Sequence, residues 1–552
     1  MESPPVSITV ATNLYASGDR SAALQVCKDL LQLQPGNLAA LNLAGACSHS
    51  LRALGDARTY WNEAIRMAPA NSELRSNLGV LLQEVGEYQE AEHHLRVAIE
   101  LQPDNAAAYF NLSRLCGSLD REVESEALCR SALAIRPDYL LAHFNLAGLL
   151  GKQRRFVESR IGYENVLRIN PNHAETHFGL GNLHVEEKNH SLAESHYLDT
   201  LRLAPGHAGA RFNLGLVLLT MGRFSEGWPL HEARFCDPHY VLPQPGCPKW
   251  SGESLRGKAI LVWQERGFGD EIQFVRFLHG LRKLGARTIT LVCKDALKSL
   301  FTGSNLGADA VLSEADAGHS AKHHDYWVHT MSLPFLLKTT PASLPARLPY
   351  LAASDEGIRR WKLRLPANGI KVGLVWKGVA THGNDANRSL PGLDSLVPLW
   401  SVPGIAFISL QKWSGEEEAQ HPPHNQPILP LGSEIQDFSD TAAIVSQLDL
   451  VICVDTAVAH LAGALGKPCW VLLPHRHTDW RWMESRDDSP WYPSVMRLFR
   501  QTDPASWSTT IAAVAAELKG FSPLPLLPDQ SFTRRMVRRI AGIWPSRRLR
   551  TP

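Results

Sequence analysis

The stretch Ala91-Glu-His-His-Leu-Arg-Val-Ala-Ile-Glu-Leu-Gln-Pro103 joins a helical pattern of apolar residues to a proline at its end. Because a proline cannot continue a helix, its position predicts where this helix stops. The same proline recurs every 34 residues, at Pro35, Pro69, Pro103, Pro137, Pro171 and Pro205. A constant period of this length indicates a repeat array, in which each unit buries its apolar face against its neighbours.

Small residues recur in register with these prolines, and they allow the two helices of a hairpin to pack closely. They are Gly45, Gly79, Ser113, Ala147, Gly181 and Gly215 in the first helices and Ala23, Ala57, Ala91, Ser125, Ser159 and Ala193 in the second helices. Together these features resemble the tetratricopeptide repeat over residues 4–235. Six repeats are clear, and a seventh begins at 212–215.

An asparagine occupies the same place in four of the repeats. These residues are Asn77, Asn111, Asn145 and Asn213, with Gly179 interrupting the series. In similar repeats of protein O-GlcNAc transferases, asparagines at this place line a concave groove and hold peptide backbone, since an amide both donates and accepts hydrogen bonds. The resemblance therefore implies a groove for a protein or peptide. The alternative interpretation is that the amides bond neighbouring repeats.

From about Gly257 the 34-residue period ends, and short apolar runs alternate with helical stretches. We predict strands at residues 259–263, 288–293, 310–312, 371–376, 405–410, 450–454 and 469–473. Such strands indicate parallel sheets covered on both faces, and two sets in series predict two Rossmann-like lobes with a ligand at the carboxyl ends of the strands. The turn after the first strand lacks the third glycine of a dinucleotide fingerprint, because residue 272 is Ile, so we expect no NAD.

Six short motifs in the carboxy-terminal half resemble one family. They are Glu265–Gln273, Trp376–Gly378, Asn387–Pro391, Asp455–Ala462, Asp479–Trp482 and Ser489–Pro493. The set is similar to bacterial proteins that couple tetratricopeptide repeats to a heptosyltransferase-like glycosyltransferase domain of the two-lobed GT-B fold. The layout also resembles protein O-GlcNAc transferases. The resemblance implies an α-solenoid followed by an α/β GT-B domain that uses a nucleotide-sugar donor.

This resemblance sets the domain boundaries that we expect. They are a repeat solenoid at 4–235, a linker at 236–256, an acceptor-side Rossmann-like lobe at 257–355, a nucleotide-sugar-side lobe at 356–520, and a basic tail at 521–552.

The donor site is expected where a helix follows the apolar strand 450–454. A helix start offers free backbone N–H groups and a positive dipole end to a diphosphate. The expected binding residues there are Asp455, Thr456, Ala457 and His460. Similar heptosyltransferases usually have Gly in place of Ala457, which leaves the identity of the donor open. The alternative for Asp455 is a helix N-cap.

Trp376, Lys377 and Gly378 end the first strand of the second lobe, and Arg388 follows in the next motif. Lys377 and Arg388 carry the charge to neutralise a leaving diphosphate. Arg388 stands where similar heptosyltransferases place a lysine that contacts phosphate; the alternative for both cations is a surface ion pair. No two aspartates are separated by one residue, so a D-x-D metal motif is absent. We expect metal-free transfer, no metal site, and no cofactor beyond the nucleotide-sugar co-substrate.

Asp270 lies in the glycine-rich turn of the first lobe. In similar heptosyltransferases this aspartate is proposed as the base that deprotonates the acceptor hydroxyl, a task that suits a partly desolvated carboxylate. The alternative is an N-cap of the next helix. His329 and Ser332 are weaker candidates for the same cleft. The aromatic residues of 479–482 and 490–493 are predicted either to stack on a base or sugar or to pack between the lobes.

The composition limits the classes of partner and the cellular compartments that fit this sequence. Lys and Arg number 56 against 55 Asp and Glu, which gives no overall preference for nucleic acid. We find no signal-like segment and no apolar run of membrane-spanning length, and the nine cysteines form no C-x-x-C pair, so we expect a cytoplasmic protein. From Ser531 the chain has seven arginines and no acid. Either an amphipathic helix contacts anionic lipid at the inner membrane face or the tail is merely solvated.

The leading hypothesis is a glycosyltransferase that holds its acceptor partly with the repeats. The alternative is a non-catalytic scaffold with a degenerate GT-B domain. A third class, a factor in carbohydrate export or assembly at the membrane, would depend on the basic tail.

Overall fold

The computed structural model describes residues 7–237, 239–320 and 323–523, in two compact units that divide between Ala210 and Arg211. The basic tail lies, from residue 524 on, outside the described residues. Across the described ranges, no helix combines the length and the apolar character that a membrane crossing requires.

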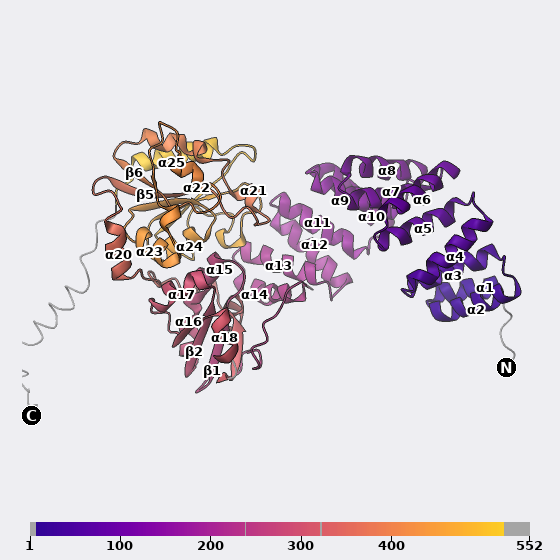
Figure 1. The fold of residues 1–552 in the computed structure, drawn as a ribbon, viewed down its shortest axis with the longest axis horizontal. Coiled ribbons are helices and arrows are strands. Elements are labelled where there is room, and N and C mark those ends of the chain that lie inside the picture. Colours follow the sequence, from indigo (N-terminus) through magenta and orange to yellow (C-terminus); the bar gives the residue numbers. More distant parts are fainter. Residues whose placement is uncertain (1–6, 238, 321–322, 524–552) are drawn as a thin grey trace, which may run out of the picture. The chain divides into compact units, whose positions relative to one another are not determined.

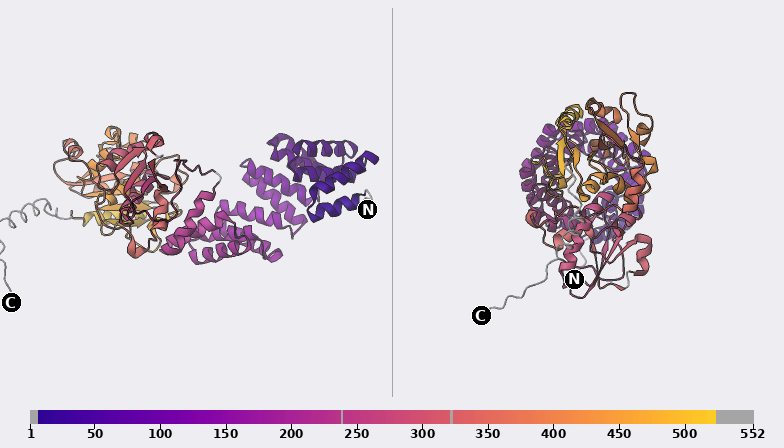
Figure 2. Two further views of the ribbon diagram at one scale, coloured as in Figure 1. Left: turned by 90° about the horizontal axis from the view of Figure 1, so that it is seen from below. Right: turned by 90° about the vertical axis from the view of Figure 1, so that its left-hand side faces the viewer.

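The first unit is built from successive antiparallel helix pairs (Figures 1 and 2). Its helices are α1 (Ile8–Ser17), α2 (Arg20–Leu33), α3 (Leu38–Ser50), α4 (Leu54–Met67), α5 (Ser72–Glu84), α6 (Tyr88–Leu101), α7 (Ala106–Ser118), α8 (Glu122–Ile135), α9 (Leu140–Lys152), α10 (Phe156–Ile169), α11 (Ala174–Glu186) and α12 (His190–Leu203). Each of the recurring prolines stands two residues beyond the end of a second helix, so the predicted period of helix pairs is confirmed.

The predicted small residues lie where the two helices of a pair approach most closely. A Cβ atom on Gly79 would stand 2.7 Å from Leu95 Cγ, and one on Gly181 would stand 2.5 Å from Tyr197 Cε1. Both distances are far below van der Waals contact, so these positions exclude any side chain unless a helix moves. The 34-residue spacing of small residues therefore follows from helix packing within each pair.

The seventh hairpin belongs to the second unit. It consists of α13 (Ala208–Thr220) and α14 (Phe224–His231), followed by a 3-10 turn (Glu232–Cys236). Trp228 is 2% exposed and meets Phe274, Trp480 and Trp491 edge to face. Because this tryptophan fills the core of the α/β unit, the second compact unit, which begins at Arg211, includes most of the seventh hairpin.

The segment that we predicted as a linker is packed in the part that the structure describes. Trp250 is 2% exposed, and its backbone N–H donates to the carbonyl of Trp327 over 2.7 Å. Leu255 is 1% exposed. Residues 249–256 therefore cover the first sheet and do not act as a free connection.

The second unit contains two wholly parallel sheets (Figure 1). The first has the order β3-β2-β1-β4, with β1 (Ala259–Trp263), β2 (Thr288–Cys293), β3 (Ala310–Ser313) and β4 (Tyr326–His329). The second has the order β10-β9-β8-β5-β6-β7, with β5 (Ile370–Val375), β6 (Ile405–Ser409), β7 (Leu429–Pro430), β8 (Leu450–Val454), β9 (Cys469–Leu473) and β10 (Met496–Arg500). Two parallel α/β lobes are confirmed, and they are consistent with a GT-B fold.

Helices connect the strands and cover the sheets. In the first lobe they are α15 (Phe268–Phe274), α16 (Leu278–Lys283), α17 (Asp295–Thr302), α18 (Glu314–Ser320) and α19 (Leu333–Leu336). In the second lobe they are α20 (Asp355–Lys362), α21 (Asp385–Arg388), α22 (Glu416–Gln420), α23 (Phe438–Val445), α24 (Ala457–Ala464) and α25 (Ser508–Lys519).

The order of the second sheet reverses between β5 and β8, which pair in register from Val372↔Leu450 to Val375↔Cys453. Loops that follow the strands on either side of such a switch point leave in opposite directions and open a crevice at the carboxyl ends. The strands β8 and β9 form the floor of this crevice, and all of their residues are buried.

Candidate functional site

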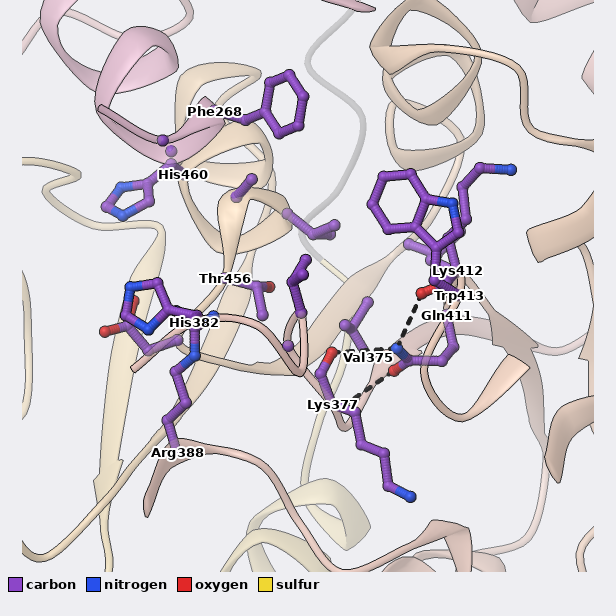
Figure 3. A pocket seen from close by; sticks show the side chains of 18 of the residues that line it. Phe268, Val375, Lys377, His382, Arg388, Gln411, Lys412, Trp413, Thr456 and His460 are labelled. Carbon is purple, nitrogen blue, oxygen red and sulfur yellow. Dashed lines mark hydrogen bonds between the residues drawn. The ribbon is translucent and has the colours of Figure 1, made fainter. Parts of the chain in front are cut away.

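A cavity of about 870 Å³ opens at the carboxyl ends of the strands of the second unit (Figure 3). The first lobe contributes the turn after β1, from Gly267 to Asp270, together with Ala296. The second lobe contributes residues that follow β5, β6, β8 and β9. This volume falls in the usual range of small-molecule sites, and its place is the one that the strand order predicts.

Thr456 lies among the lining residues, with Arg388 and His382 to one side and Trp413 and Lys412 to the other (Figure 3). Thr456 is the N-cap of α24, yet its hydroxyl makes no cap bond. The Oγ1 atom is buried and has no hydrogen-bond partner among the described residues. A buried polar atom without a partner is costly, so its position in this cavity suits a ligand that bonds to it.

Asp455 precedes this helix at the end of β8 and also lines the cavity. Burial, reinforced by the negative charge of Asp479, raises the pKa of the Asp455 carboxyl from 3.8 to about 6. A carboxylate held at such a pKa is more often found at functional sites than on ordinary surfaces.

His460 follows one turn later on α24. Its Nδ1 lies 2.9 Å from the hydroxyl of Tyr492, and its ring stacks on Trp482. Burial and the nearby Arg481 guanidinium hold the pKa of His460 well below its usual range, so the ring is neutral at pH 7. With Nδ1 taken by Tyr492, Nε2 is the ring atom left for a ligand.

The two lobes touch where α15 and α24 begin. A Cβ atom on Gly269 would stand 2.8 Å from His460 Cδ2 and 3.6 Å from Ala457 Cα. Glycine at 269 therefore allows the glycine-rich turn of the first lobe to reach the start of the donor-side helix. Ala457 occupies the first turn of α24 and lines the cavity, as the sequence predicted for that position.

Asp270 stands in this turn with both carboxylate oxygens engaged. Oδ2 accepts a 2.8 Å hydrogen bond from the backbone N–H of Gly267, so Asp270 does cap α15. Oδ1 forms an ion pair with Arg481 from the opposite lobe. Burial raises the pKa of Asp270 above its ordinary value, and the charge of Arg481 opposes this shift.

Arg481 is a functional candidate that the sequence analysis did not single out. Its Nη1 donates to both oxygens of Asp479, over 2.9 and 2.8 Å, and its Nε donates to Gln273 Oε1 over 2.6 Å. It therefore links Asp479 on the second lobe to Asp270 and Gln273 on the first. In the sequence, the one feature that pointed to this residue was an arginine between two tryptophans in the motif 479–482.

Trp376, Lys377 and Gly378 differ in their relation to the cavity. Trp376 is fully buried in the core and does not line the cavity; its Nε1 donates to Glu418 over 2.9 Å. Lys377 Nζ donates to the same carboxylate over 2.5 Å, and its side chain points away from Thr456 and His460 in Figure 3. Trp376 and Lys377 thus anchor the loop after β5, because Glu418 takes both of their polar atoms.

Gly378 makes room for Arg388. A Cβ atom on Gly378 would stand 2.6 Å from Arg388 Nη2. Arg388 lines the cavity with a side chain that is 15% exposed, and its Nε lies 3.4 Å from Asp385 Oδ1. Lys377 and Arg388 both line the cavity, but Glu418 pairs closely with the lysine, whereas the longer contact with Asp385 engages the guanidinium less.

Trp413 is the second residue that sequence reasoning missed. It lines the cavity, is 63% exposed, and has a left-handed backbone with φ of 63°. An exposed indole in a strained loop offers an apolar platform for a flat ring. Its only signal in the sequence was a tryptophan three residues after the predicted strand 405–410.

The weaker candidates lie elsewhere. His329 and Ser332 are 2% and 0% exposed, and neither lines the cavity. Ser332 instead bonds Arg234 and Glu232 in a buried cluster. The expectation that these two residues line the cleft is wrong, because His329 at the end of β4 and Ser332 in the 3-10 turn after it are both buried away from the cavity.

The aromatic residues of the last two motifs pack in the core and do not line the cavity. Trp480, Trp482, Trp491 and Tyr492 are 7%, 0%, 0% and 0% exposed. Of the two predicted alternatives, packing between lobes is the one that the geometry supports. Only Asp479 and Arg481 of these two motifs reach the cavity.

In the first unit, the amides of the asparagine series bond the preceding repeat. Asn77 Nδ2 donates to Asn42 Oδ1 over 3.1 Å, and Asn111 Nδ2 donates to Ser76 Oγ over 3.0 Å. Asn145 Nδ2 donates to the hydroxyl of Ser113 over 3.2 Å. Asn213 lies on α13 in the second unit. Each of the three bonded amides has a second N–H and a carbonyl oxygen that can hydrogen-bond a peptide backbone. The peptide groove therefore stays a prediction.

Replacing Asn77, Asn111 and Asn145 together with alanine is expected to destabilise the repeats. Three hydrogen bonds at about 0.5–1.5 kcal/mol each predict a loss of about 1.5–4.5 kcal/mol if the effects add. Urea unfolding of the full chain, followed by circular dichroism, measures this loss. An unchanged urea midpoint for the helical repeats would show that the three amides do not join them.

Comparison with known proteins agrees with this architecture. The tetratricopeptide repeat family matches residues 11–72, 76–140 and 178–227, and glycosyltransferase family 9 (heptosyltransferase) matches residues 407–502. The chain therefore carries tetratricopeptide repeats in its amino-terminal part and a glycosyltransferase family 9 domain in its carboxy-terminal part.

Among curated proteins, the chain is similar to the protein FlbA of Caulobacter vibrioides, with 30% identity over 327 residues. The match covers 55% of this chain and 54% of that protein, so the chain spans about half the length of this relative.

Two solved structures show a weaker likeness. PilF of Pseudomonas aeruginosa has a TM-score of 0.34 at 19% identity, over 37% of this chain and 93% of that chain. The Cut9–Hcn1 hetero-tetramer has a TM-score of 0.39 at 17% identity, over 44% and 48%.

Proposed function

We propose that the carboxy-terminal part transfers a sugar from a nucleotide-sugar donor to an acceptor hydroxyl, and that the donor occupies the cavity between the lobes. The observation that carries this proposal is the buried, unpartnered hydroxyl of Thr456 at the start of α24. A hydroxyl and free backbone N–H groups at a helix start are the donors that a diphosphate requires. The glycosyltransferase family 9 match, which includes this helix, supports the same assignment.

Three further groups complete the donor site in this proposal. Arg388 pairs with the diphosphate, because it lines the cavity and its contact with Asp385 is longer than the contact of Lys377 with Glu418. Asp455 accepts hydrogen bonds from hydroxyls of the donor. Trp413 stacks on the base, since stacking needs an exposed aromatic face at the edge of the cavity.

In the proposed chemical step, Asp270 is the base. The acceptor oxygen attacks the anomeric carbon, its proton passes to the Asp270 carboxylate, and the bond from that carbon to the diphosphate oxygen breaks. The electron pair of that bond leaves with the nucleoside diphosphate. Arg481 holds Asp270 ionised and oriented, and Arg388 with the α24 N-terminus stabilises the charge on the leaving group.

Replacing Arg388 with lysine is expected to weaken donor binding about tenfold, because an ammonium keeps the charge but loses the two-pronged hydrogen bonding of a guanidinium. Titration calorimetry with the bound donor measures the change. EDTA is expected to leave turnover intact, since Arg388 and the helix end take the electrostatic role of a metal. Arg497→Lys is the matched control, because Arg497 pairs with Glu517 on an exposed surface. Loss of activity in EDTA would contradict metal-free transfer.

The repeats supply the acceptor in this proposal. Repeat solenoids commonly bind protein segments, which supports a protein or peptide acceptor over a small molecule. Release of nucleoside diphosphate tests the function as a whole. The full chain is incubated with UDP-, GDP-, ADP- and dTDP-sugars, and nucleotide release is followed with and without a cell-derived protein fraction. Release from one donor supports the enzyme; release from none of them, with a folded chain, favours the non-catalytic scaffold.

A further inference from the structure

The hairpin of α11 and α12 brings together two histidines and an aspartate that the glycosyltransferase site does not use. His177 lies on α11, and His196 and Asp199 lie on α12. The Nδ1 atoms of the two histidines are 3.3 Å apart, and Asp199 Oδ2 is 3.9 Å from His177 Nδ1. One candidate ligand atom from each residue lies within 4.8 Å of the others.

These distances fit a shared metal ion. Two imidazole nitrogens that bind one tetrahedral ion at about 2.0–2.1 Å lie about 3.3–3.4 Å apart, which is the separation of the two Nδ1 atoms. The carboxylate oxygen needs only a small side-chain rotation to reach the same point. The third ligand is half-exposed, with 37% of the Asp199 side chain accessible, so an ion has a path to the site.

The tautomer of His177 suits it to bind a metal ion through Nδ1. Its Nε2 lies 3.2 Å from the carbonyl oxygen of Pro171, and a carbonyl only accepts, so Nε2 carries the proton. Nδ1 therefore presents a lone pair toward His196. A histidine that binds a metal usually donates its other ring N–H to a carbonyl or carboxylate in just this manner.

The remaining partners orient and neutralise the cluster. Arg202 Nη2 bonds Asp199 Oδ1 over 3.2 Å, which leaves Oδ2 for His177. His184 stacks on His196 with ring planes 10° apart.

We propose that His177, His196 and Asp199 form a site for a divalent first-row transition metal such as Zn²⁺. Two imidazoles and one carboxylate suit this class of ion, and the remaining coordination position is open to water or to a ligand from a bound partner. This proposed site differs from the expectation, drawn from the sequence, that the chain has no metal site. It lies in the repeats, and so it is separate from the metal-free transfer proposed for the second unit.

The preceding repeat provides a matched control. His143 stands 34 residues before His177. Like His177, it has its Nε2 near a proline carbonyl, in this case 2.8 Å from the carbonyl oxygen of Pro137. The residues equivalent to His196 and Asp199 in that repeat are Gly162 and Asn165. His143 therefore has the same helix position and the same backbone bond as His177 but lacks the other two ligands.

Equilibrium dialysis of the full chain against Zn²⁺, with metal content measured by mass spectrometry, tests the site. Wild type and His143→Ala are expected to bind one equivalent more than His196→Ala. Asp199→Asn, at a half-exposed position, is expected to fold normally and to bind at least about tenfold more weakly. Co²⁺ is expected to give the visible absorption of a tetrahedral site in wild type and to lose it in His196→Ala.

Equal metal content in wild type, His196→Ala and Asp199→Asn would overturn the proposal. It would also be overturned if His143→Ala lost as much metal as His196→Ala, because binding would then follow the number of histidines and not the cluster. In either case, the contact between the two imidazoles is a hydrogen bond from His196 to His177.

Discussion

Replacing Asp270 with asparagine is expected to lower the turnover number by about 10²–10⁴-fold and to leave donor affinity unchanged, because the variant loses the general base and its ion pair with Arg481, neither of which is placed at the donor. The asparagine carbonyl still accepts from the N–H of Gly267, and Arg481 keeps its two bonds to Asp479. The turn and the lobe contact therefore survive the substitution. Initial-rate kinetics and titration calorimetry with the same donor separate the two effects.

The matched control for this variant is Asp309→Asn. Asp309 lies in the same lobe, accepts from the backbone N–H of Ile289 over 2.7 Å, and pairs with Arg282 over 2.6 Å, but it does not line the cavity. It is expected to turn over at the wild-type rate. Undiminished turnover in a folded Asp270→Asn protein would contradict the assignment of Asp270 as the base.

Replacing Asp455 with asparagine is expected to stabilise the fold and weaken donor binding at the same time. The folded-state pKa of about 6 lies above the ordinary value of 3.8, so the folded protein binds the Asp455 proton more tightly than the unfolded chain does. Stability is therefore fully retained below pH 4 and falls as the pH rises toward 6. Above pH 6 the ionised carboxylate lowers the free energy of unfolding by about 1–3 kcal/mol. The neutral amide of the variant has no such effect.

Urea unfolding of wild type and Asp455→Asn at pH 4, 6 and 8 measures this difference, which is expected to grow with pH. Donor titration at pH 8 is expected to show binding at least about tenfold weaker in the variant, because two hydrogen bonds from hydroxyls to a charged acceptor are lost. A variant that is no more stable at pH 8 than wild type would contradict the raised pKa. Equal donor affinity would remove Asp455 from the donor site.

The elements that could be predicted are those whose signal is local and periodic. The prolines and small residues recur because each helix pair has the same packing, so they located six hairpins. The strands β1, β2, β8 and β9 match the predicted ranges residue for residue, since an apolar run buried on both faces has clear ends. A helix was predicted to follow the strand 450–454, and α24 does follow β8, beginning at Ala457.

The features that escaped prediction depend on contacts between distant segments. Arg481 gains its importance only because α15 brings Asp270 beside it, and no local pattern records that pairing. Trp228 lies in the seventh hairpin but packs in the core of the second unit, and no periodic signal records that contact. β4 and β10 were missed because Tyr326–His329 is short and Met496–Arg500 carries two arginines.

Charge alone does not rank the two candidate cations for the diphosphate. Lys377 and Arg388 both line the cavity, and Glu418 pairs with the lysine at closer range than Asp385 does with the arginine. The partner of Lys377 is 41 residues away in the sequence, so no local pattern indicates that pairing. The sequence therefore identified a loop that lines the cavity, and the role of each cation in it stays a prediction.

Thermal unfolding of the full chain with UDP-, GDP-, ADP- and dTDP-sugars tests most directly whether the cavity binds a nucleotide sugar. We predict that one of them raises the Tm of wild type, since a donor at 100 times its Kd adds about 2.7 kcal/mol to stability. The same donor is expected to give a smaller shift with Arg388→Lys and an unchanged shift with Arg497→Lys. A folded wild-type protein whose Tm does not move with any of the four classes of donor would contradict a nucleotide-sugar site in this cavity.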